Sequence, residues 1–323
     1  MNATFKFTCA VALTAFAVAA PAQPQQSYPN KPVRLVVPYP PGGGADNLAR
    51  MLVDKLTQRL GQQVIIDNRP GANGNIGMEI VAKAPADGYT MVINASTWAV
   101  NPSLYKLPFD PIKDFAPIIQ ISSSPGVLVV HPSLPVKNVK ELVALAKAQP
   151  GKLDYGSAGI GGFGHISAAV FTLMTGTRMV HIPYKGAAPA LIDLLAGQIQ
   201  VLFSDAAATM PHLKSGRMRA LAVTSIKRMP ALSELPTIDE AGVKGYDNSS
   251  WMAIAMAAGT PKEIIARLNS DLSAILKLPD IQEKSAALGA VIIGGTPEQF
   301  ADYLKSEIAK FARVVKDAKI TAQ

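Results

Sequence analysis

The sequence predicts an α/β fold of two lobes, with mainly parallel strands in each lobe. Short apolar runs alternate with stretches of helical periodicity along most of the chain, which is typical of strand–helix–strand units. A glycine-rich turn joins a strand to a helix twice, at residues 38–46 and at residues 156–165. Because each half has its own turn, we expect two lobes with a ligand cleft between them.

The first 22 residues have the features of a secretory signal peptide. Lys6 precedes an apolar stretch at residues 7–20, and the small residues Ala20, Pro21 and Ala22 follow as a cleavage pattern. The stretch is too short to span a bilayer, so we expect export to the bacterial periplasm and removal of residues 1–22. Cys9 is the only cysteine, so the mature chain would have no disulfide and no thiolate chemistry.

Length and charge limit the possible classes of function. Removing 22 of 323 residues leaves 301, which suits two domains of roughly 150 residues each. The formal net charge falls from +8 to +7, because Lys6 is the only charged residue lost. The basic residues are scattered, without runs or interleaved aromatics, so nucleic-acid binding has no support. No later apolar run has transmembrane length.

The first glycine-rich turn, PYPPGGGAD at residues 38–46, predicts an anion-binding site. It lies between an apolar strand at residues 33–37 and a helix at residues 47–60. A helix start has unpaired N–H groups and partial positive charge, and glycines let these groups approach a ligand. Asp46 is expected to be the N-cap. The alternative is a plain turn that needs glycine for positive φ, and both interpretations stay open.

The other predicted elements alternate along the chain. The first half has strands at 64–66 and 89–94, a helix at 77–84, and a proline-marked irregular connection at 102–117. The second half has strands at 152–155, 179–183, 200–204, 219–223 and 251–257. Its helices are predicted at 139–148, 165–175, 187–195, 207–214, 261–276, 281–288 and 297–315.

The chain is expected to cross between the lobes twice. Apolar runs at 118–121 and 127–130 are separated by a Ser/Pro/Gly break at 122–126, which suits a passage between lobes. A second crossing near 245–256 would return the chain. The predicted domains are residues 23–125 plus 250–323, and residues 126–249, with the ligand site in the cleft between them.

The second glycine-rich turn, GSAGIGGFGH at residues 156–165, allows three interpretations. It contains G-x-G-x-x-G, but the next strand lacks the acidic residue that would hold a ribose. Ser157 resembles a nucleophile elbow, but Tyr155 stands where that motif needs glycine, and no base is visible nearby. We therefore favour the third interpretation, in which Ser157 presents its hydroxyl and N–H groups to an anion.

Residues for metal or acid–base chemistry are lacking. The four histidines, His131, His165, His181 and His212, have no close metal-ligand spacing, and we expect each to be a capping or packing residue. No pair of carboxylates lies near either turn. We therefore expect a non-enzymatic protein with no cofactor and no bound metal.

With both turns in view, the sequence resembles the substrate-binding proteins of tripartite tricarboxylate transporters, the Bug family. The blocks that carry the resemblance are residues 36–46, 68–74, 84–90, 155–165, 183–186 and 205. The resemblance implies a two-lobe periplasmic binding protein, type II-like, that closes on a small carboxylate. It would act as a monomer and deliver the carboxylate to the membrane permease subunits. A periplasmic sensor that presents the carboxylate to a signalling receptor is an alternative that the sequence does not separate from transport.

The resemblance also implies which residues bind the ligand. Backbone groups of the two turns would grip the carboxylate, with other donors and cleft-facing side chains around it: Pro41, Gly42, Gly43, Gly44, Ser96, Thr97, Ser157, Gly161, Gly162, Phe163, His165, Tyr184 and Asp205. Asp205 would repel an anion unless it accepts a hydrogen bond from the ligand. Alternatively, Asp205 caps the helix that follows it.

One departure from the family pattern bears on the ligand. Many family members have Asn and then Ser or Thr before the histidine, whereas this chain has Ile160, Gly162, Phe163 and Gly164. The loss of donors disfavours a polar distal group, and Phe163 with Trp98 would stack on a flat ligand. We therefore expect an aromatic or apolar mono- or dicarboxylate rather than citrate or an amino acid. The alternative is that Phe163 packs inside its own lobe.

Overall fold

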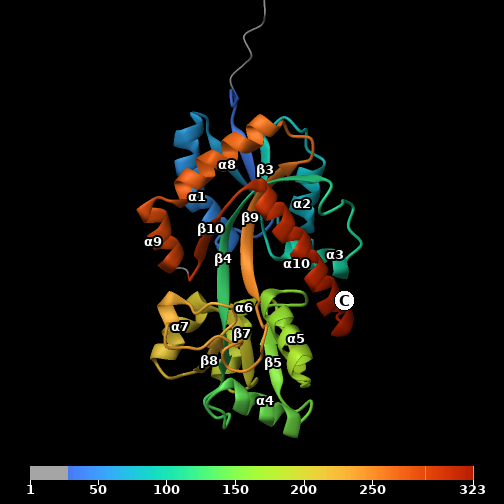
Figure 1. The fold of residues 1–323 in the computed structure, drawn as a ribbon, viewed down its shortest axis with the longest axis vertical. Coiled ribbons are helices and arrows are strands. Elements are labelled where there is room, and N and C mark those ends of the chain that lie inside the picture. Colours follow the sequence, from blue (N-terminus) through green and yellow to red (C-terminus); the bar gives the residue numbers. More distant parts are fainter. Residues whose placement is uncertain (1–27, 288, 323) are drawn as a thin grey trace, which may run out of the picture.

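The structure is a computed structural model that describes residues 28–287 and 289–322. The predicted signal peptide lies outside these residues. The chain forms two lobes, which lie one above the other along the longest axis of the molecule (Figure 1). Among the described residues, no helix is long and apolar enough to cross a membrane.

The first lobe combines the N-terminal part of the chain with its C-terminal helices. Its strands are β1 (Val33–Val37), β2 (Val64–Asn68), β3 (Thr90–Ala95) and β10 (Val291–Gly294). Its helices are α1 (Gly44–Leu60), α2 (Asn75–Ala82), α3 (Thr97–Leu104), α8 (Lys262–Leu276), α9 (Pro279–Ala287) and α10 (Pro297–Asp317), with the 3₁₀ turn η1 (Ala72–Gly74). The apolar face of α1 is buried at Ala49, Leu52, Leu56 and Leu60, as its helical period requires.

The second lobe is formed by the middle of the chain. Its strands are β5 (Asp154–Ser157), β6 (Val180–Pro183), β7 (Val201–Asp205) and β8 (Arg219–Val223). Its helices are α4 (Val139–Ala148), α5 (Phe163–Thr175), α6 (Ala187–Leu195) and α7 (Ala206–Lys214), with the 3₁₀ turn η2 (Pro230–Leu232). Each lobe is therefore an α/β unit, as predicted.

Two long strands, β4 (Phe115–Val130) and β9 (Ser249–Ala257), run between the lobes (Figure 1). The strand order is β2-β1-β3-β9-β4-β7-β5-β6, and β10 and β8 also pair with β4. The outer strands pair in parallel within each lobe, β1 with β2 and β3, and β5 with β6 and β7. Up to Pro125, β4 pairs with β9 and β10, and from Gly126 onward it pairs with β7 and β8. The domain boundaries after residues 125 and 249 stay a prediction.

Three local predictions are wrong. The predicted break at 122–126 is part of the continuous strand β4, because its backbone pairs with β9 at residues 122–125 and with β7 at Gly126. The predicted irregular connection at 102–117 begins inside the helix α3, which runs to Leu104 and has Pro102 in its interior. The end of the chain is not purely helical, because β10 pairs antiparallel with β4.

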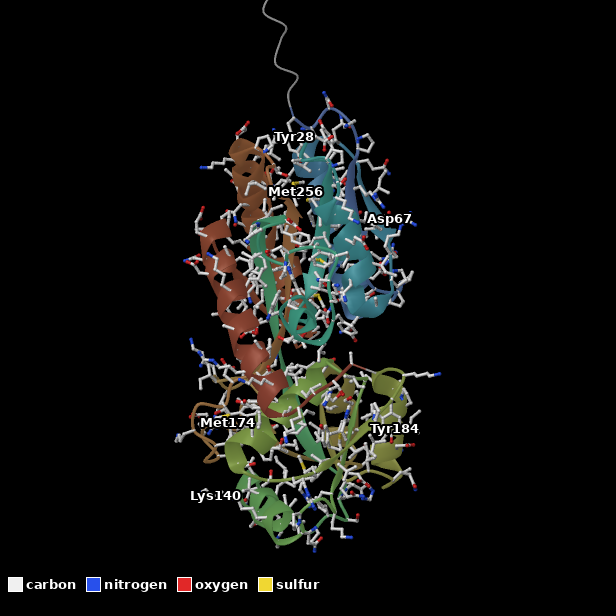
Figure 2. The ribbon with its side chains drawn as sticks, turned by 90° about the vertical axis from the view of Figure 1, so that its right-hand side faces the viewer. Tyr28, Asp67, Lys140, Met174, Tyr184 and Met256 are labelled. Atoms are coloured by element: carbon white, nitrogen blue, oxygen red, sulfur yellow. The ribbon has the colours of Figure 1, made fainter. Side chains whose placement is uncertain are left out.

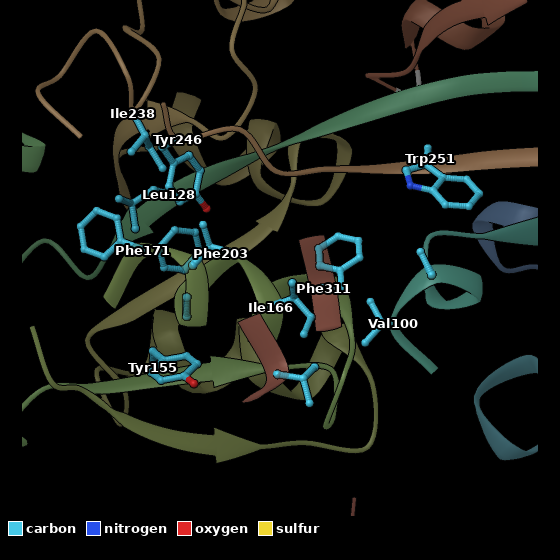
Figure 3. Close-up of a cluster of buried hydrophobic side chains, with 14 of the residues drawn as sticks. Val100, Leu128, Tyr155, Ile166, Phe171, Phe203, Ile238, Tyr246, Trp251 and Phe311 are labelled. Atoms are coloured by element: carbon cyan, nitrogen blue, oxygen red, sulfur yellow. The ribbon is translucent and has the colours of Figure 1, made fainter. Parts of the chain in front are cut away.

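The C-terminal helix α10 contacts both lobes. It begins with a capping box between Thr296 and Gln299, and it packs along α3 of the first lobe. Near its end, Phe311 is buried in a core cluster that also contains Val100 of α3 and Ile166 of α5. Figure 3 shows these three side chains close together. Burying one such aromatic side chain contributes about 1.5–3 kcal/mol, so this contact stabilises the arrangement of the lobes.

Candidate functional site

The first glycine-rich turn is held in place by a buried carboxylate. Asp46 is 1% exposed and accepts hydrogen bonds from the Gly42 N–H at 2.9 Å, the Arg50 guanidinium at 2.9 Å and the Asn68 amide at 3.0 Å. The hydrogen bond from Arg50, helped by the Gly42 and Asn68 donors, lowers the pKa of Asp46 to about 2. The prediction that Asp46 is the N-cap is wrong, because Gly43 occupies that position.

This anchoring decides which groups of the turn are free. The Gly42 N–H is occupied by Asp46, so it has no donor left for a ligand. The next N–H groups, of Gly44, Ala45 and Asp46, belong to the first turn of α1 and have no partner in the part of the chain that the structure describes. Pro41 and Gly44 are exposed and Gly43 is half-buried. The turn therefore presents the N-terminus of α1 rather than Gly42.

A hydroxyl network lies beside this turn. The Tyr39 hydroxyl donates to Asn94 Oδ1 at 2.6 Å and lies 2.7 Å from Thr97 Oγ1. Burial raises the pKa of Tyr39 to about 12, so the phenol stays protonated as a donor. Thr97 is thus half-buried at the start of α3, with its hydroxyl already bound. Tyr39 and Asn94 were not predicted as site residues, although Tyr39 is part of the turn motif itself.

The second glycine-rich turn is also held from within. Ser157 is 1% exposed, and its Oγ donates to the Gly159 carbonyl at 3.0 Å and lies 2.7 Å from His181 Nε2. The Gly161 N–H donates to His165 Nδ1 at 3.1 Å. The prediction that no base lies near Ser157 is wrong. However, the buried hydroxyl is engaged inside the protein, and so is the Gly161 N–H.

Gly161 lies where the two lobes approach each other. Its φ is +75°, and a Cβ added there would lie 2.5 Å from Leu104 of α3 in the first lobe. A side chain at this position would therefore collide with the other lobe. Gly162 instead takes the N-cap position of α5, which leaves the N–H groups of Phe163 and Gly164 unpaired within the described residues.

The second lobe has a small pocket where helices begin. It has a volume of about 50 Å³ and is lined by Ala158, Phe163, Gly164, Ala187, Ala190, Leu202, Phe203, Ser204 and Asp205. Apart from Ala158 of the second glycine-rich turn, these residues belong to the starts of α5 and α6 and to the end of β7, just before α7. Several helix N-termini directed at one pocket favour an anion.

Asp205 occupies the N-cap position of α7, but its side chain makes no capping hydrogen bond. The carboxyl is reachable by solvent and yet densely surrounded by protein, and this desolvation raises its pKa above the usual range. Such a combination is typical of a group at the base of a concave surface. The capping interpretation is therefore right for the position of Asp205 and wrong for its side chain.

Groups of both lobes meet on one face of the linking strands. Ser96 Oγ of the first lobe lies 3.5 Å from Ser250 Oγ on β9, and Ser250 pairs with Ser124 on β4. Gly126 lies two residues beyond Ser124 on the same face of β4, at a distance of roughly 7 Å along the strand. A Cβ on Gly126 would lie 2.4 Å from the Phe163 ring, so this ring of the second lobe covers that face. Asp205 pairs directly with Gly126, which places its side chain there too.

Two predicted aromatic contributions differ from expectation. Trp98 is 2% exposed, packs edge-on against Phe115 and Phe300, and donates from Nε1 to the Pro111 carbonyl. It belongs to the core of the first lobe, so the predicted stacking of Trp98 on a ligand is wrong. Tyr184, labelled in Figure 2, donates its hydroxyl to Asp193 of α6 at 2.7 Å. Its donor is therefore used within the second lobe.

The described residues include no group of three or more His, Cys, Asp or Glu side chains that would hold a metal ion. Two α/β lobes that share long linking strands, and bring helix N-termini to one face of them, define the class of periplasmic solute-binding proteins. Within this class, the chain belongs to the tripartite tricarboxylate transporter receptor family, whose model matches residues 48–320.

Comparison with related proteins supports the same family assignment. Rpa4515 of R. palustris, solved with adipate, is 41% identical with a TM-score of 0.80, over 91% of this chain and 100% of that one. MatC (Rpa3494) of Rhodopseudomonas palustris, solved with malate, is 28% identical with a TM-score of 0.75, over 89% of this chain and 100% of that one. Protein BugT of Bordetella pertussis is 36% identical over 303 residues, 93% of each chain.

Proposed function

We propose that this protein captures a small aromatic or apolar mono- or dicarboxylate in the cleft between its lobes. It then delivers this ligand to the membrane permease subunits of a tripartite tricarboxylate-type transporter. The observation that carries the proposal is the set of unpaired N–H groups at the starts of α1 and α5, in different lobes. Backbone donors at helix N-termini bind carboxylates without a compensating basic side chain. Both sets contact the ligand together when the lobes close, so the ligand favours the closed state.

The apolar character of the ligand is supported by the residues around the second turn. Phe163 replaces polar donors, and the pocket beside it is lined mainly by Ala, Gly and Phe. The relative with 41% identity was solved with adipate, whose carboxylates are joined by an unbranched methylene chain. Of the two rings predicted to stack on the ligand, Trp98 is buried and Phe163 lines the pocket. We therefore rank an apolar dicarboxylate such as adipate ahead of benzoate.

The proposed function places the mature protein in the periplasm, after removal of the predicted signal peptide. A receptor for a membrane transporter must meet its ligand on the outer side of the cytoplasmic membrane. The family of the chain supports this location. The same argument makes the permease subunits the expected partner.

The test compares ligand-induced stabilisation in matched variants. Wild type, Gly43→Leu and Ala286→Leu are heated with adipate, malate, benzoate or NAD. Gly43 has φ −74°, and an added Cβ would meet only the Pro40 carbonyl, at 3.4 Å, so a side chain fits the backbone but blocks the turn. Ala286 is exposed on α9 and receives the same bulk away from the cleft.

A ligand at about 100 times its Kd adds ~2.7 kcal/mol of apparent stability. We expect adipate to stabilise wild type and Ala286→Leu, and to leave Gly43→Leu unchanged while its melting temperature without ligand stays near wild type. Stabilisation of Gly43→Leu equal to wild type would refute the role of the first turn. Stabilisation by NAD alone would overturn the proposed function.

A further inference from the structure

A larger pocket, of about 430 Å³, lies beside the second glycine-rich turn and apart from the small pocket at Asp205. Its walls come from α5, from the strands β5 and β6, and from the C-terminal residues 318–321 that follow α10. These C-terminal residues reach the second lobe from the first, so the pocket lies between segments of different lobes. Nothing in the proposed carboxylate cleft requires it.

One wall of the pocket consists of three stacked rings. His181 stacks on His165 with ring centroids 3.8 Å apart and on Tyr155 at 4.9 Å. Each histidine uses one ring nitrogen to hold the turn, His165 Nδ1 for the Gly161 N–H and His181 Nε2 for Ser157 Oγ. Because His165 Nδ1 is an acceptor, its neutral ring carries the proton on Nε2. This N–H has no partner among the described residues and His165 lines the pocket, so it is a donor available there.

Tyr155 supplies a second unused donor. Its side chain lines the pocket and is 6% exposed, yet its hydroxyl makes no hydrogen bond to any residue that the structure describes. The hydroxyl oxygen is reachable from the pocket rather than sealed in the core, so it can donate to a molecule bound there.

The charges around the pocket indicate the sign of that molecule. Arg178 and Lys319 line it, and neither side chain is paired with a carboxylate in the described part of the chain. No acidic residue lines the pocket. Burial lowers the pKa of both histidines to about 4, so at neutral pH they donate as uncharged rings and the positive charge comes from Arg178 and Lys319.

We propose that this pocket is a second binding site, which takes a small oxyanion, either a carboxylate or an inorganic sulfate or phosphate. The Tyr155 hydroxyl and His165 Nε2–H donate to the anion, and Arg178 neutralises its charge. The same two histidine rings hold the second glycine-rich turn by their other nitrogens. An anion in this pocket therefore fixes the rings that support the turn.

The test follows the histidine ring nitrogens by ¹⁵N NMR in the mature protein. Sulfate, phosphate and acetate are titrated separately at constant ionic strength. We expect a saturable shift of the His165 signals, with His181 following, while His131 and His212, which do not line the pocket, serve as internal controls. Saturation by acetate alone identifies a carboxylate site, and saturation by sulfate or phosphate identifies an inorganic oxyanion site.

Variants decide whether these donors bind the anion. Tyr155→Phe removes one donor. Arg178→Gln removes the positive charge, and because Arg178 is exposed it leaves the core undisturbed. Each variant should bind the anion with about tenfold lower affinity than wild type. Arg217→Gln removes an exposed arginine elsewhere in the second lobe and should titrate as wild type. The Gly43→Leu variant should keep the shift, which separates this site from the carboxylate cleft. An equal shift of all four histidines, no saturable shift of His165, or wild-type titration by Arg178→Gln would overturn the proposal.

Discussion

The contact between Gly126 and Phe163 gives the sharpest test of how the cleft face is built. An alanine Cβ at residue 126 would lie 2.4 and 2.5 Å from Cε1 and Cζ of the Phe163 ring, and 2.9 Å from the Ser204 carbonyl oxygen. Ordinary contacts begin at 3.4 Å, so the ring must move by about 1 Å. The backbone has little freedom to give way, because the Gly126 N–H donates to Thr224 Oγ1 at 2.8 Å.

Overpacking of this kind costs about 1–3 kcal/mol, so Gly126→Ala should lower the free energy of unfolding by that amount. In a Phe163→Ala background, the two close contacts to the ring are gone and the contact to the Ser204 carbonyl oxygen remains. The same substitution should then cost roughly 1–2 kcal/mol less, which is the coupling energy of a double-mutant cycle. The displaced ring enters the cleft, so Gly126→Ala should also weaken adipate binding, and Phe163→Ala should remove that effect.

The cycle is measured by urea denaturation of the four proteins without ligand, and by calorimetry with adipate. Gly43→Ala is the matched control, because its new Cβ has no contact closer than 3.4 Å and should leave stability nearly unchanged. If Gly126→Ala lowers the free energy of unfolding by the same amount with and without the Phe163 ring, the ring does not cover the linking strands as described. The placement of the second lobe's contribution to the cleft would then be wrong.

Asp46→Asn removes the ion pair with Arg50 and the charge-assisted bond from the Gly42 N–H, so stability measured by denaturation should fall by about 1.5–3 kcal/mol. Adipate affinity by calorimetry should fall with it, and wild-type values for both would show that this carboxylate does not anchor the turn. Acidification should also destabilise the protein, because His165 and His181 have pKa values of about 4 in the folded state against 6.5 unfolded. Between pH 4 and 6.5 the unfolded state binds more protons than the folded state, so the free energy of unfolding falls as the pH decreases from 6.5 to 4. This free energy should fall less steeply with pH in His165→Gln. The same slope in wild type and His165→Gln would contradict the prediction.

Local signals in the sequence explain the parts of the fold that were predicted well. The bounds of β1, α4, α6 and β8 agree with the predicted ranges, because each has strong apolar periodicity and clear flanking residues. The helix α3 was not predicted, because an internal proline normally ends a helix. The strand β10 is four residues long, and its partner β4 is far away in the sequence, so no local pattern indicates it.

In the candidate site too, features set by neighbouring residues could be predicted, whereas features set by distant residues could not. Both glycine-rich turns could be found from the sequence, since their function as helix starts depends on adjacent residues. Which donors stay free depends on tertiary contacts, such as Asp46 on Gly42 and His181 on Ser157. The burial of Trp98 among Phe115 and Phe300 likewise depends on residues that are distant in the chain.

The path of α10 has a consequence for how the cleft opens. If the lobes simply moved apart, Phe311 of α10 and Ile166 of α5 would separate, and both are now almost fully buried. Exposing two such side chains costs several kcal/mol, on the order of 1.5–3 each. A rotation whose axis passes close to this contact, together with bending of β4 and β9, avoids that cost. The cleft should therefore open by rotation about a hinge axis that lies along α10, and its entrance should be widest on the side opposite this helix.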